Sequence, residues 1–379
     1  MHILFKLLDI TKNKLKYFLN ILFIYFFILS IYLTNINIYC IKKTKKNRIA
    51  IIGYHNDNNI GNQLIKYAMN LFLKKNGFNP TLISFNELKN INIDFLKKYL
   101  VIKEINNYST DINEGDFDYL LVNSDQVWAS NYKQILEVGF LSFAKNWNIP
   151  KTVYGASLAY EYWVSSKDII NSAKKLIKQF SGVSVREINS VELIKNYLGI
   201  KPIFVLDPTF LISKFDYLEI IKDFKLDIDI NKNYLVSYIL DKSSIKESYI
   251  NKIHEELKFE IISIEVGTKN FIEKFIFLIN ICKSIITDSY HGTVFSIIFN
   301  KPFITFINSK RGNIRFFSLN QTFKLSNRFI NPIETKKIDL ETLTKSPNIN
   351  LVNFNSLKEK SIKFLKDNLD FGIKSKKRK

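Results

Sequence analysis

Short apolar segments alternate with amphipathic helical segments from residue 48 to residue 322, and this alternation restricts the fold more than any other feature of the sequence. Segments such as 48–54 ("RIAIIGY") and 152–159 ("TVYGASLA") have the length of a strand and few charged residues, as strands buried on both faces do. The segments between them, such as 61–77, place apolar residues on one face of a helix. The alternation therefore predicts an α/β fold with parallel sheets covered by helices on both faces.

The alternation is interrupted over residues 211–233, which hold a short polar helix and no clear strand. We therefore expect two Rossmann-like domains, at 48–215 and 216–345. An apolar helical segment with basic flanks precedes them at 1–47, and a helix with a basic tail follows at 346–379. Because ligands in open α/β sheets bind beyond the carboxyl ends of the strands, two such domains predict a site in the cleft that they face.

The N-terminal segment 17–41 carries no charged side chain and is long enough to span a bilayer. Lysines lie on both sides of it, so charge does not give its orientation. It predicts membrane association, either as a spanning helix or as a helix lying in the interface. A signal peptide and a helix buried in the globular part are the alternatives, and no small-residue cleavage site follows the apolar core.

The net charge of +20 comes from 55 basic and 35 acidic residues. It is compatible with an anionic substrate or a membrane surface. The lysines are scattered, with one basic run at 374–379, so we expect no nucleic-acid binding. The two cysteines, Cys40 and Cys282, lack the spacing of a zinc site, and no metal is expected.

A histidine stands at the strand-to-helix junction "ITDSYHGTVFS". Ser289 is expected to cap the helix, and Gly292 leaves its first turn uncrowded. This helix start, which includes Thr293, is predicted to hold an anionic group with the help of the helix dipole. His291 would give or take a proton beside that group. The alternative is a structural histidine with satisfied partners.

Polar residues and one tryptophan follow two other predicted strands, in "GYHNDNNIGNQL" and "VNSDQVWAS". Hydrogen-bonding groups beside a flat apolar face suit a sugar. The predicted acceptor-binding residues are Asn58, Asn62, Asp125, Gln126 and Trp128. The alternatives are an Asn-rich loop that caps its helix, and a cap followed by a core tryptophan.

Arg186 ends the predicted strand in "VSVRE", where its rigid charged fork would bind a carboxylate or phosphate. An ion pair with Glu187 or another acid is the alternative. Asp207 precedes a proline that stops its strand, and it is expected to shape the cleft by bonding backbone amides. Asp288 is assigned the same structural role.

Read together and in order, the segments "NIGNQL", "NSDQVW", "YGASLA", "VSVREINSVELIK", "VLDPTFL" and "ITDSYHGTVFSIIFNKPFI" resemble the polysaccharide pyruvyl transferase family. The resemblance covers residues 48–330. It implies a fold like that of the GT-B glycosyltransferases, with no metal and no redox cofactor. It also implies that Arg186 binds phosphoenolpyruvate and that His291 is catalytic.

The reaction implied by the resemblance moves a pyruvyl group from phosphoenolpyruvate to a sugar of a cell-surface polysaccharide or its lipid-linked precursor, as a ketal. Since phosphoenolpyruvate is cytosolic, we expect a membrane-associated protein with its catalytic domains in the cytoplasm. Two alternatives remain: a GT-B-type glycosyltransferase that uses a nucleotide-sugar, and a glycan-binding relic without catalysis.

Overall fold

The computed structural model describes residues 22–30, 47–54, 59–85, 94–129, 134–163, 165–332 and 339–369. The chain divides into two units, 1–47 and 48–379. In the first unit, residues 22–30 form a helix whose side chains are exposed from residue 23 onward. Among the described residues, no helix combines the length and the apolar character that a bilayer span requires. The rest of the segment 17–41 lies outside the described residues, so its membrane association stays a prediction.

The first sheet of the second unit has seven strands in the order β3-β2-β1-β4-β5-β6-β7. Its strands are β1 (Asn47–Ile52), β2 (Phe78–Phe85), β3 (Val101–Ile105), β4 (Tyr119–Val122), β5 (Lys151–Ala156), β6 (Gly182–Val185) and β7 (Ile203–Phe204). The pairs β2–β3, β1–β4, β4–β5, β5–β6 and β6–β7 are parallel. The order reverses between β1 and β4, and such a reversal is where open α/β sheets bind ligands.

The second sheet has five strands in the order β12-β11-β10-β8-β9. Its strands are β8 (Tyr234–Tyr238), β9 (Glu260–Ser263), β10 (Ser284–Thr287), β11 (Phe303–Phe306) and β12 (Phe329–Ile330). All four neighbouring pairs are parallel. Here the order reverses between β8 and β10, so each sheet offers one reversal point. The sheets part between β7 and β8, while the exact domain boundaries stay predictions.

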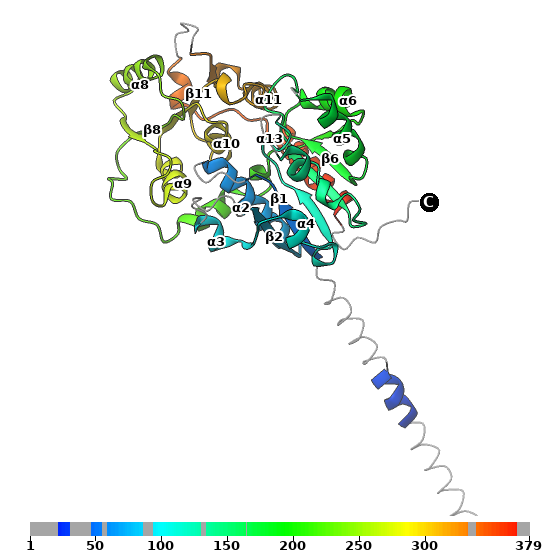
Figure 1. Cartoon of the computed structure of the whole chain (residues 1–379). Helices are drawn as coiled ribbons and strands as arrows, with labels where there is room; N and C mark the ends of the chain where they lie inside the picture. The colour runs from blue at the N-terminus through cyan, green and yellow to red at the C-terminus, as the bar shows by residue number, and fades with distance from the viewer. Residues whose placement is uncertain are drawn as a thin grey trace, which may run out of the picture. The chain divides into compact units, whose positions relative to one another are not determined.

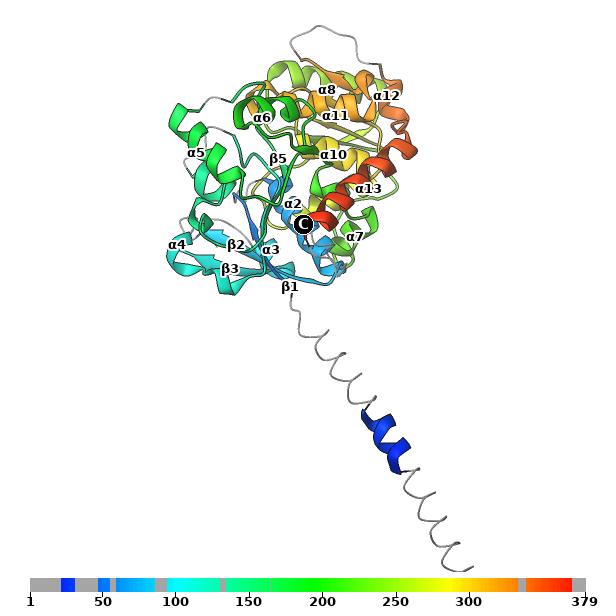
Figure 2. The same ribbon diagram turned by 90° about the vertical axis from the view of Figure 1, so that its right-hand side faces the viewer.

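Helices cover both faces of the sheets (Figures 1 and 2). The α-helices are α2 (Ile60–Lys75), α3 (Asp94–Tyr99), α4 (Tyr108–Asp111), α5 (Lys167–Ile177), α6 (Ser190–Leu198), α7 (Lys214–Leu218), α8 (Ser244–Leu257), α9 (Phe271–Ile281), α10 (Tyr290–Ile298), α11 (Ile314–Phe323), α12 (Glu341–Thr344) and α13 (Leu351–Asn368). Short 3₁₀ helices include Pro208–Phe210 and Ser309–Arg311. The predicted alternation of strands and helices in two parallel sheets is confirmed.

Successive side chains of β1 pack into two different core clusters, as expected for a strand covered on both faces. Ile49 and Ile51 belong to one core cluster, whereas Ala50 and Ile52 belong to another. All four side chains are fully buried. Because successive side chains point to opposite faces of a sheet, helices must cover both faces of β1.

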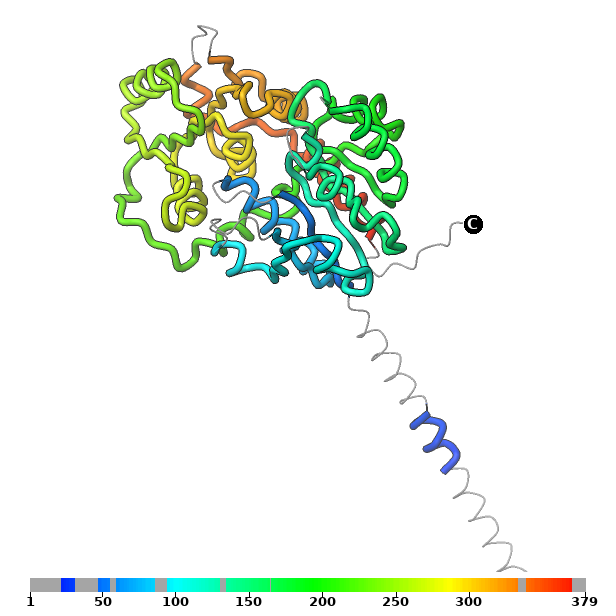
Figure 3. The backbone as a smooth tube through the Cα atoms, in the orientation of Figure 1, coloured from blue at the N-terminus to red at the C-terminus, as the bar shows by residue number. Residues whose placement is uncertain are grey.

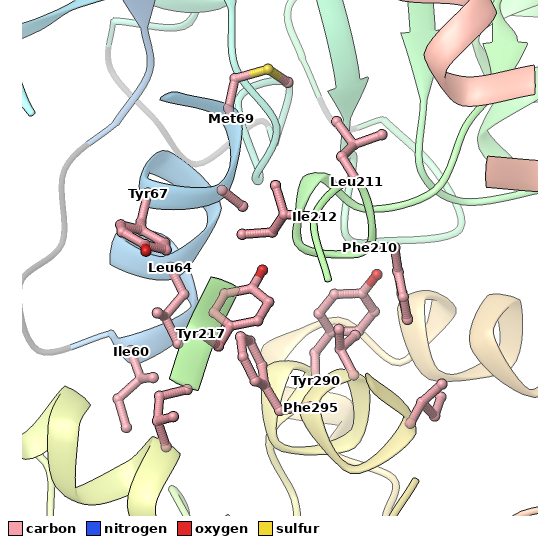
Figure 4. Packing of buried hydrophobic residues seen from close by; sticks show 14 of the residues in the cluster. Ile60, Leu64, Tyr67, Met69, Phe210, Leu211, Ile212, Tyr217, Tyr290 and Phe295 are labelled. Atoms are coloured by element: carbon pink, nitrogen blue, oxygen red, sulfur yellow. The ribbon is translucent and has the colours of Figure 1, made fainter. Parts of the chain in front are cut away.

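Aromatic residues join the two sheets through helices α2 and α10. Figure 4 shows Tyr217 of α7 between these helices. Its ring centroid lies 4.8 Å from that of Phe295 on α10 and 6.1 Å from that of Tyr67 on α2. The chain then returns to the first sheet through α13 (Figure 3), where the Ser361 hydroxyl accepts a hydrogen bond of 2.9 Å from the backbone N–H of Leu206. The aromatic contacts connect α2 to α10 through α7.

Candidate active site

A cavity of about 230 Å³ opens where the reversal points of the two sheets meet. From the first sheet it is lined by residues that follow β1, β4 and β5, and from the second by residues that follow β8, β10 and β11. Its lining residues are Tyr54, Asn59, Asn62, Asp125, Gln126, Tyr160, Leu240, Asp288, Ser289, Tyr290, His291, Lys310, Arg311, Arg315 and Phe316. The cleft site expected from the sequence thus exists between the two sheets.

His291 lies in the first turn of α10, in the wall of this cavity, and is 5% exposed. Its Nε2 lies 3.6 Å from Oδ2 of Asp207, just beyond hydrogen-bonding distance. On its other side is Gly61 in the first turn of α2, where a Cβ atom would fall 1.7 Å from the imidazole Nδ1. The ring is therefore held between a carboxylate and the backbone of a helix start.

Asp207 connects His291 to a buried network of charged residues. Its Oδ2 accepts a hydrogen bond of 2.7 Å from Nη1 of Arg186, and its Oδ1 accepts one of 3.0 Å from the backbone N–H of Thr209. The Arg186 guanidinium also donates to Asp125 at 3.1 Å, and Asn62 donates to the same carboxylate at 2.7 Å. The network thus runs from α2 through Asp125 and Arg186 to His291.

Neighbouring charges set the protonation of the two aspartates. Burial raises the pKa of the Asp207 carboxyl, but His291 and Arg186 outweigh burial and hold this pKa well below its usual range. Burial also raises the pKa of Asp125, and Arg186 leads the groups that bring it below the ordinary value. At Glu187 the effect of burial is larger than the opposing effect of the Arg186 charge, so the pKa of Glu187 is raised. Asp207 and Asp125 therefore stay ionised at neutral pH.

Asp125 also adopts an unusual backbone conformation, with φ of 129°. A residue other than glycine in this region costs about 1–3 kcal/mol and is found mostly at functional sites. In this conformation the carboxylate is hydrogen-bonded to Arg186 and Asn62.

Arg186 does not line the cavity. Its side chain is 0% exposed and is enclosed by the carboxylates of Asp125, Glu187 and Asp207. The alternative that the sequence left open, an ion pair with acidic neighbours, is what the structure contains. The predicted direct contact between Arg186 and a donor is not supported by this arrangement, in which the guanidinium orients carboxylates.

The start of α10 also differs from its expected role. Ser289 caps the helix as predicted, since its Oγ accepts a hydrogen bond of 3.2 Å from the backbone N–H of Gly292. That N–H is therefore already bonded. Gly292 has no room for a side chain because a Cβ atom would lie 2.3 Å from Oγ1 of Thr287. Thr293 points into the interior, with its hydroxyl bonded to Ser289 and Thr305. Of the predicted donor-binding residues, Ser289 alone lines the cavity.

Three of the predicted acceptor-binding residues, Asn62, Asp125 and Gln126, line the cavity. Trp128 does not. It is fully buried, its Nε1–H donates to the carbonyl of Gly139 at 2.9 Å, and its ring stacks on Phe140 with centroids 5.2 Å apart. The prediction that Trp128 offers its face to a sugar is therefore wrong, because the ring is part of the core. Asn58 lies outside the described residues.

Asp288 is held by the second sheet. Its Oδ1 accepts a hydrogen bond of 2.6 Å from the backbone N–H of Leu240, and its Oδ2 accepts one of 3.1 Å from that of Asp241. The ammonium of Lys246 lies 2.7 Å from the same carboxylate. These bonds tie the loop after β8 to the end of β10. Asp288 thus makes the backbone contacts of the kind expected for a structural cleft residue.

Three cations that were not among the predicted site residues line the cavity: Lys310, Arg311 and Arg315. Arg311 is paired with Asp241, with 2.6 Å between Nε and Oδ2. In the part of the chain that the structure describes, no carboxylate lies within ion-pair distance of Lys310 or Arg315. The signal in the sequence is the basic stretch "KRGNIR" at 310–315, shortly after β11 and so near the strand end where ligands bind.

Arg315 completes the wall opposite the first sheet. It is 7% exposed, and its guanidinium carbon lies 5.2 Å from the ring centroid of Tyr290. With the amide of Gln126 turned so that its oxygen faces Arg315, the oxygen accepts hydrogen bonds of 3.3 Å and 3.2 Å. Burial, followed by the charge of Arg186, lowers the pKa of Arg315. A bound anion would relieve both effects. Within the described residues, no group of three or more His, Cys, Asp or Glu side chains is arranged to hold a metal ion.

Several solved structures are similar to this chain. UDP-GlcNAc 2-epimerase from Neisseria meningitidis bound to UDP-GlcNAc is 10% identical, with 84% of this chain and 99% of that chain covered and a TM-score of 0.47. UGT89C1 from Arabidopsis thaliana complexed with UDP-L-rhamnose is 11% identical, with 84% and 95% covered and a TM-score of 0.48. UDP-GlcNAc 2-epimerase from Methanocaldococcus jannaschii is 14% identical, with 84% and 99% covered and a TM-score of 0.44.

No curated protein sequence matches the chain. The family model described as "Polysaccharide pyruvyl transferase" matches residues 59–310, which is more than half of the 379 residues. The matched region begins at the start of α2, contains the reversal point of the second sheet, and includes the cavity-lining residues from Asn59 to Lys310. This chain belongs to the polysaccharide pyruvyl transferase family and is a transferase.

Proposed function

We propose that this enzyme transfers a pyruvyl group from phosphoenolpyruvate to two hydroxyl groups of one sugar, in a cell-surface polysaccharide or its lipid-linked precursor. One hydroxyl loses its proton as its oxygen adds to the central carbon of phosphoenolpyruvate, while a proton is delivered to the methylene carbon, which becomes a methyl group. The second hydroxyl oxygen then displaces phosphate from the same carbon, and its proton leaves with the phosphate. The products are a pyruvate ketal and one inorganic phosphate.

The observation that carries this proposal is the setting of His291 in the cavity wall. The ionised Asp207 carboxylate lies 3.6 Å from Nε2, and Nε2 makes no hydrogen bond within the described residues. An imidazole in the wall of a small cavity, with Nε2 not engaged by another group, is placed to act as the general acid that delivers a proton to the methylene carbon. General acid catalysis of this kind contributes about 10²–10⁴ in rate.

The charges around the cavity suit the two anionic groups of phosphoenolpyruvate. Arg315 and Lys310 are cations without a carboxylate partner among the described residues, and Arg311 lies beside them. Guanidinium groups bind carboxylate and phosphate through paired hydrogen bonds. On the opposite wall, Asn62, Asp125 and Gln126 offer hydrogen bonds to sugar hydroxyls.

The size of the cavity favours a small donor over a nucleotide-sugar. At about 230 Å³ it is below the range of about 300–1,000 Å³ in which larger ligands bind. A nucleotide-sugar donor on a GT-B-like fold and a glycan-binding relic remain the alternatives. We further propose that the catalytic unit works in the cytoplasm, where phosphoenolpyruvate is made, and that residues 17–41 associate with the membrane.

Phosphate release tests the proposal. The full chain is incubated with phosphoenolpyruvate and a panel of oligosaccharides, and in parallel with UDP-sugars and the same panel. We expect phosphate to appear in step with ketal formation on an acceptor, and His291→Ala to lower the rate about 10²–10⁴-fold. Release of UDP with glycosidic bond formation would establish the glycosyltransferase instead. Acceptor binding that His291→Ala leaves unchanged, with no product from either donor, would establish the relic.

A further inference from the structure

A second cavity, of about 480 Å³, lies at the other end of α10 from His291. Its walls come from the segment after β7, from the last turn of α10 and from the start of α13, which lies near α10 and α7 in Figure 2. They are mostly apolar, with Phe210, Ile212, Ile297, Ile298, Ile349 and Phe354. About 480 Å³ with apolar walls and few polar groups is typical of a site for a small ligand. This second cavity shares no lining residue with the candidate active site, and the proposed reaction does not involve it.

One lining residue of this apolar cavity and two sequence neighbours of lining residues are exposed hydrophobic side chains. Leu351 lines the cavity and is 67% exposed, and its neighbour Val352 is 78% exposed. Phe215, beside the lining residue Lys214, is also 67% exposed. Exposed apolar groups gathered beside an apolar hollow indicate a surface that meets an apolar partner. A bound hydrocarbon would remove these apolar side chains from water, and burial of apolar surface is favourable in free energy.

Two lysines give the cavity a positive charge. Lys214 and Lys358 line it, and neither forms an ion pair with a carboxylate in the part of the chain that the structure describes. The nearby Asp216 is already paired with Lys75 and bonded to Ser213. Burial lowers the pKa of Lys358, a change that a bound anion would oppose. Within the described residues, the cavity therefore combines apolar walls with two cations that have no carboxylate partner.

We propose that this cavity binds the hydrocarbon chain of an anionic amphiphile, with the chain against α10 and α13 and a phosphate group beside Lys214 and Lys358. Apolar walls with an ammonium at the rim match a chain that ends in phosphate. The chain's own apolar segment 17–41 has no acidic residue, and its tail at 374–379 is basic. Neither segment complements the two lysines.

Photo-crosslinking of the full chain tests this assignment. The probe is dodecyl phosphate with a diazirine at the end of its chain, and the labelled peptides are mapped by mass spectrometry. We expect label on the peptides that contain Ile297 and Ile349. Unmodified dodecyl phosphate should compete, whereas dodecyl maltoside and inorganic phosphate should not. Lys214→Glu should lower the labelling about tenfold, which corresponds to about 1.4 kcal/mol.

Lys252→Glu is the matched control, since it makes the same charge change on an exposed position of α8 away from the cavity. It should leave the labelling unchanged. Asn348→Trp, at an exposed lining position, should block the cavity without a change of charge. Label confined to residues 17–41 would overturn the assignment. Equal competition by dodecyl maltoside or by inorganic phosphate, or full labelling of Lys214→Glu, would do the same.

Discussion

Gly61 lies so close to His291 that a single methyl group at its Cα would overlap the imidazole, with the added carbon 1.7 Å from Nδ1. The two residues are 230 positions apart, and they come from the first turns of α2 and α10. The start of α2 is therefore one wall of the space that holds the histidine. Asp207 at 3.6 Å is another.

Gly61→Ala should inactivate the enzyme while the fold persists. Helix propensity alone favours alanine over glycine by about 1 kcal/mol, so a loss of stability would measure the overlap with the ring. The imidazole can escape the added methyl group only by moving from its present place beside Asp207. We expect activity to fall about 10²-fold or more, measured as phosphate release from phosphoenolpyruvate. Gly115→Ala, where a Cβ meets nothing within 4 Å, should have no effect on activity. Wild-type activity in Gly61→Ala would contradict the assigned position of His291.

Asp207→Asn should lower stability at neutral pH by about 3 kcal/mol, because removal of one partner from a buried ion pair leaves the other charge uncompensated. The folded pKa of Asp207 is depressed, so its contribution is present above the ordinary value of about 3.9 and is lost as pH falls through the folded value. Thermal unfolding from pH 7 down to pH 3 measures this. The difference between wild type and Asp207→Asn should shrink at the acidic end, and a constant difference would contradict the assignment.

Glu187→Gln should behave in the opposite way. Burial raises the folded pKa of Glu187, so its carboxyl stabilises the fold below the unfolded pKa of about 4.3 and loses that contribution as pH rises through the folded value. A neutral amide of the same shape avoids the buried charge. We expect the melting temperature of Glu187→Gln at pH 7 to equal or exceed that of wild type. A loss as large as that of Asp207→Asn would show that Arg186 needs all three carboxylates.

The sequence was sufficient to predict the alternating strands and helices, the cap at Ser289 and the gathering of polar residues at strand ends, since all of these are local patterns. The edge strand β3 was missed because "VIKEI" has charged residues and exposed positions, so its strand character comes from pairing with β2. β12 has two residues and no pattern of its own. In each case a tertiary contact decides the structure.

The site was predicted only in part, because some of its features also depend on tertiary contacts. The sequence indicated that Arg186, Asp207 and His291 end strands or begin helices, but not that carboxylates enclose the arginine. That enclosure depends on Asp125 and Asp207, which come from different strand ends. Arg315 was missed because it lies one helical turn beyond Arg311, in a helix whose sequence pattern is typical of a helix that packs on a sheet.

Arg315→Met should weaken the binding of phosphoenolpyruvate. A hydrogen bond to a charged group contributes about 1.5–3 kcal/mol, so KM for the donor should rise about 10- to 100-fold. KM for the acceptor should change less. Arg48→Met removes an arginine from an ion pair with Asp118 at the start of β1, away from the cavity, and serves as the control. An equal rise of the donor KM in the two variants would contradict the assignment of Arg315 to the donor site.

Trp128→Phe should affect stability and leave both KM values unchanged. The substitution removes the hydrogen bond to the Gly139 carbonyl and part of the stacking on Phe140. We expect a loss of about 1–3 kcal/mol in the free energy of unfolding, measured by urea denaturation. A rise in KM for the glycan with unchanged stability would restore the sugar-binding role that the buried ring excludes.

The most direct test of the account is the thermal stability of the full chain with phosphoenolpyruvate, compared with UDP-GlcNAc. A ligand at 100 times its dissociation constant adds about 2.7 kcal/mol of stability. We predict such a gain with phosphoenolpyruvate, a smaller gain for Arg315→Met and no gain with UDP-GlcNAc. Stabilisation by UDP-GlcNAc alone would contradict the proposed donor, and so would a gain with phosphoenolpyruvate that Arg315→Met leaves unchanged.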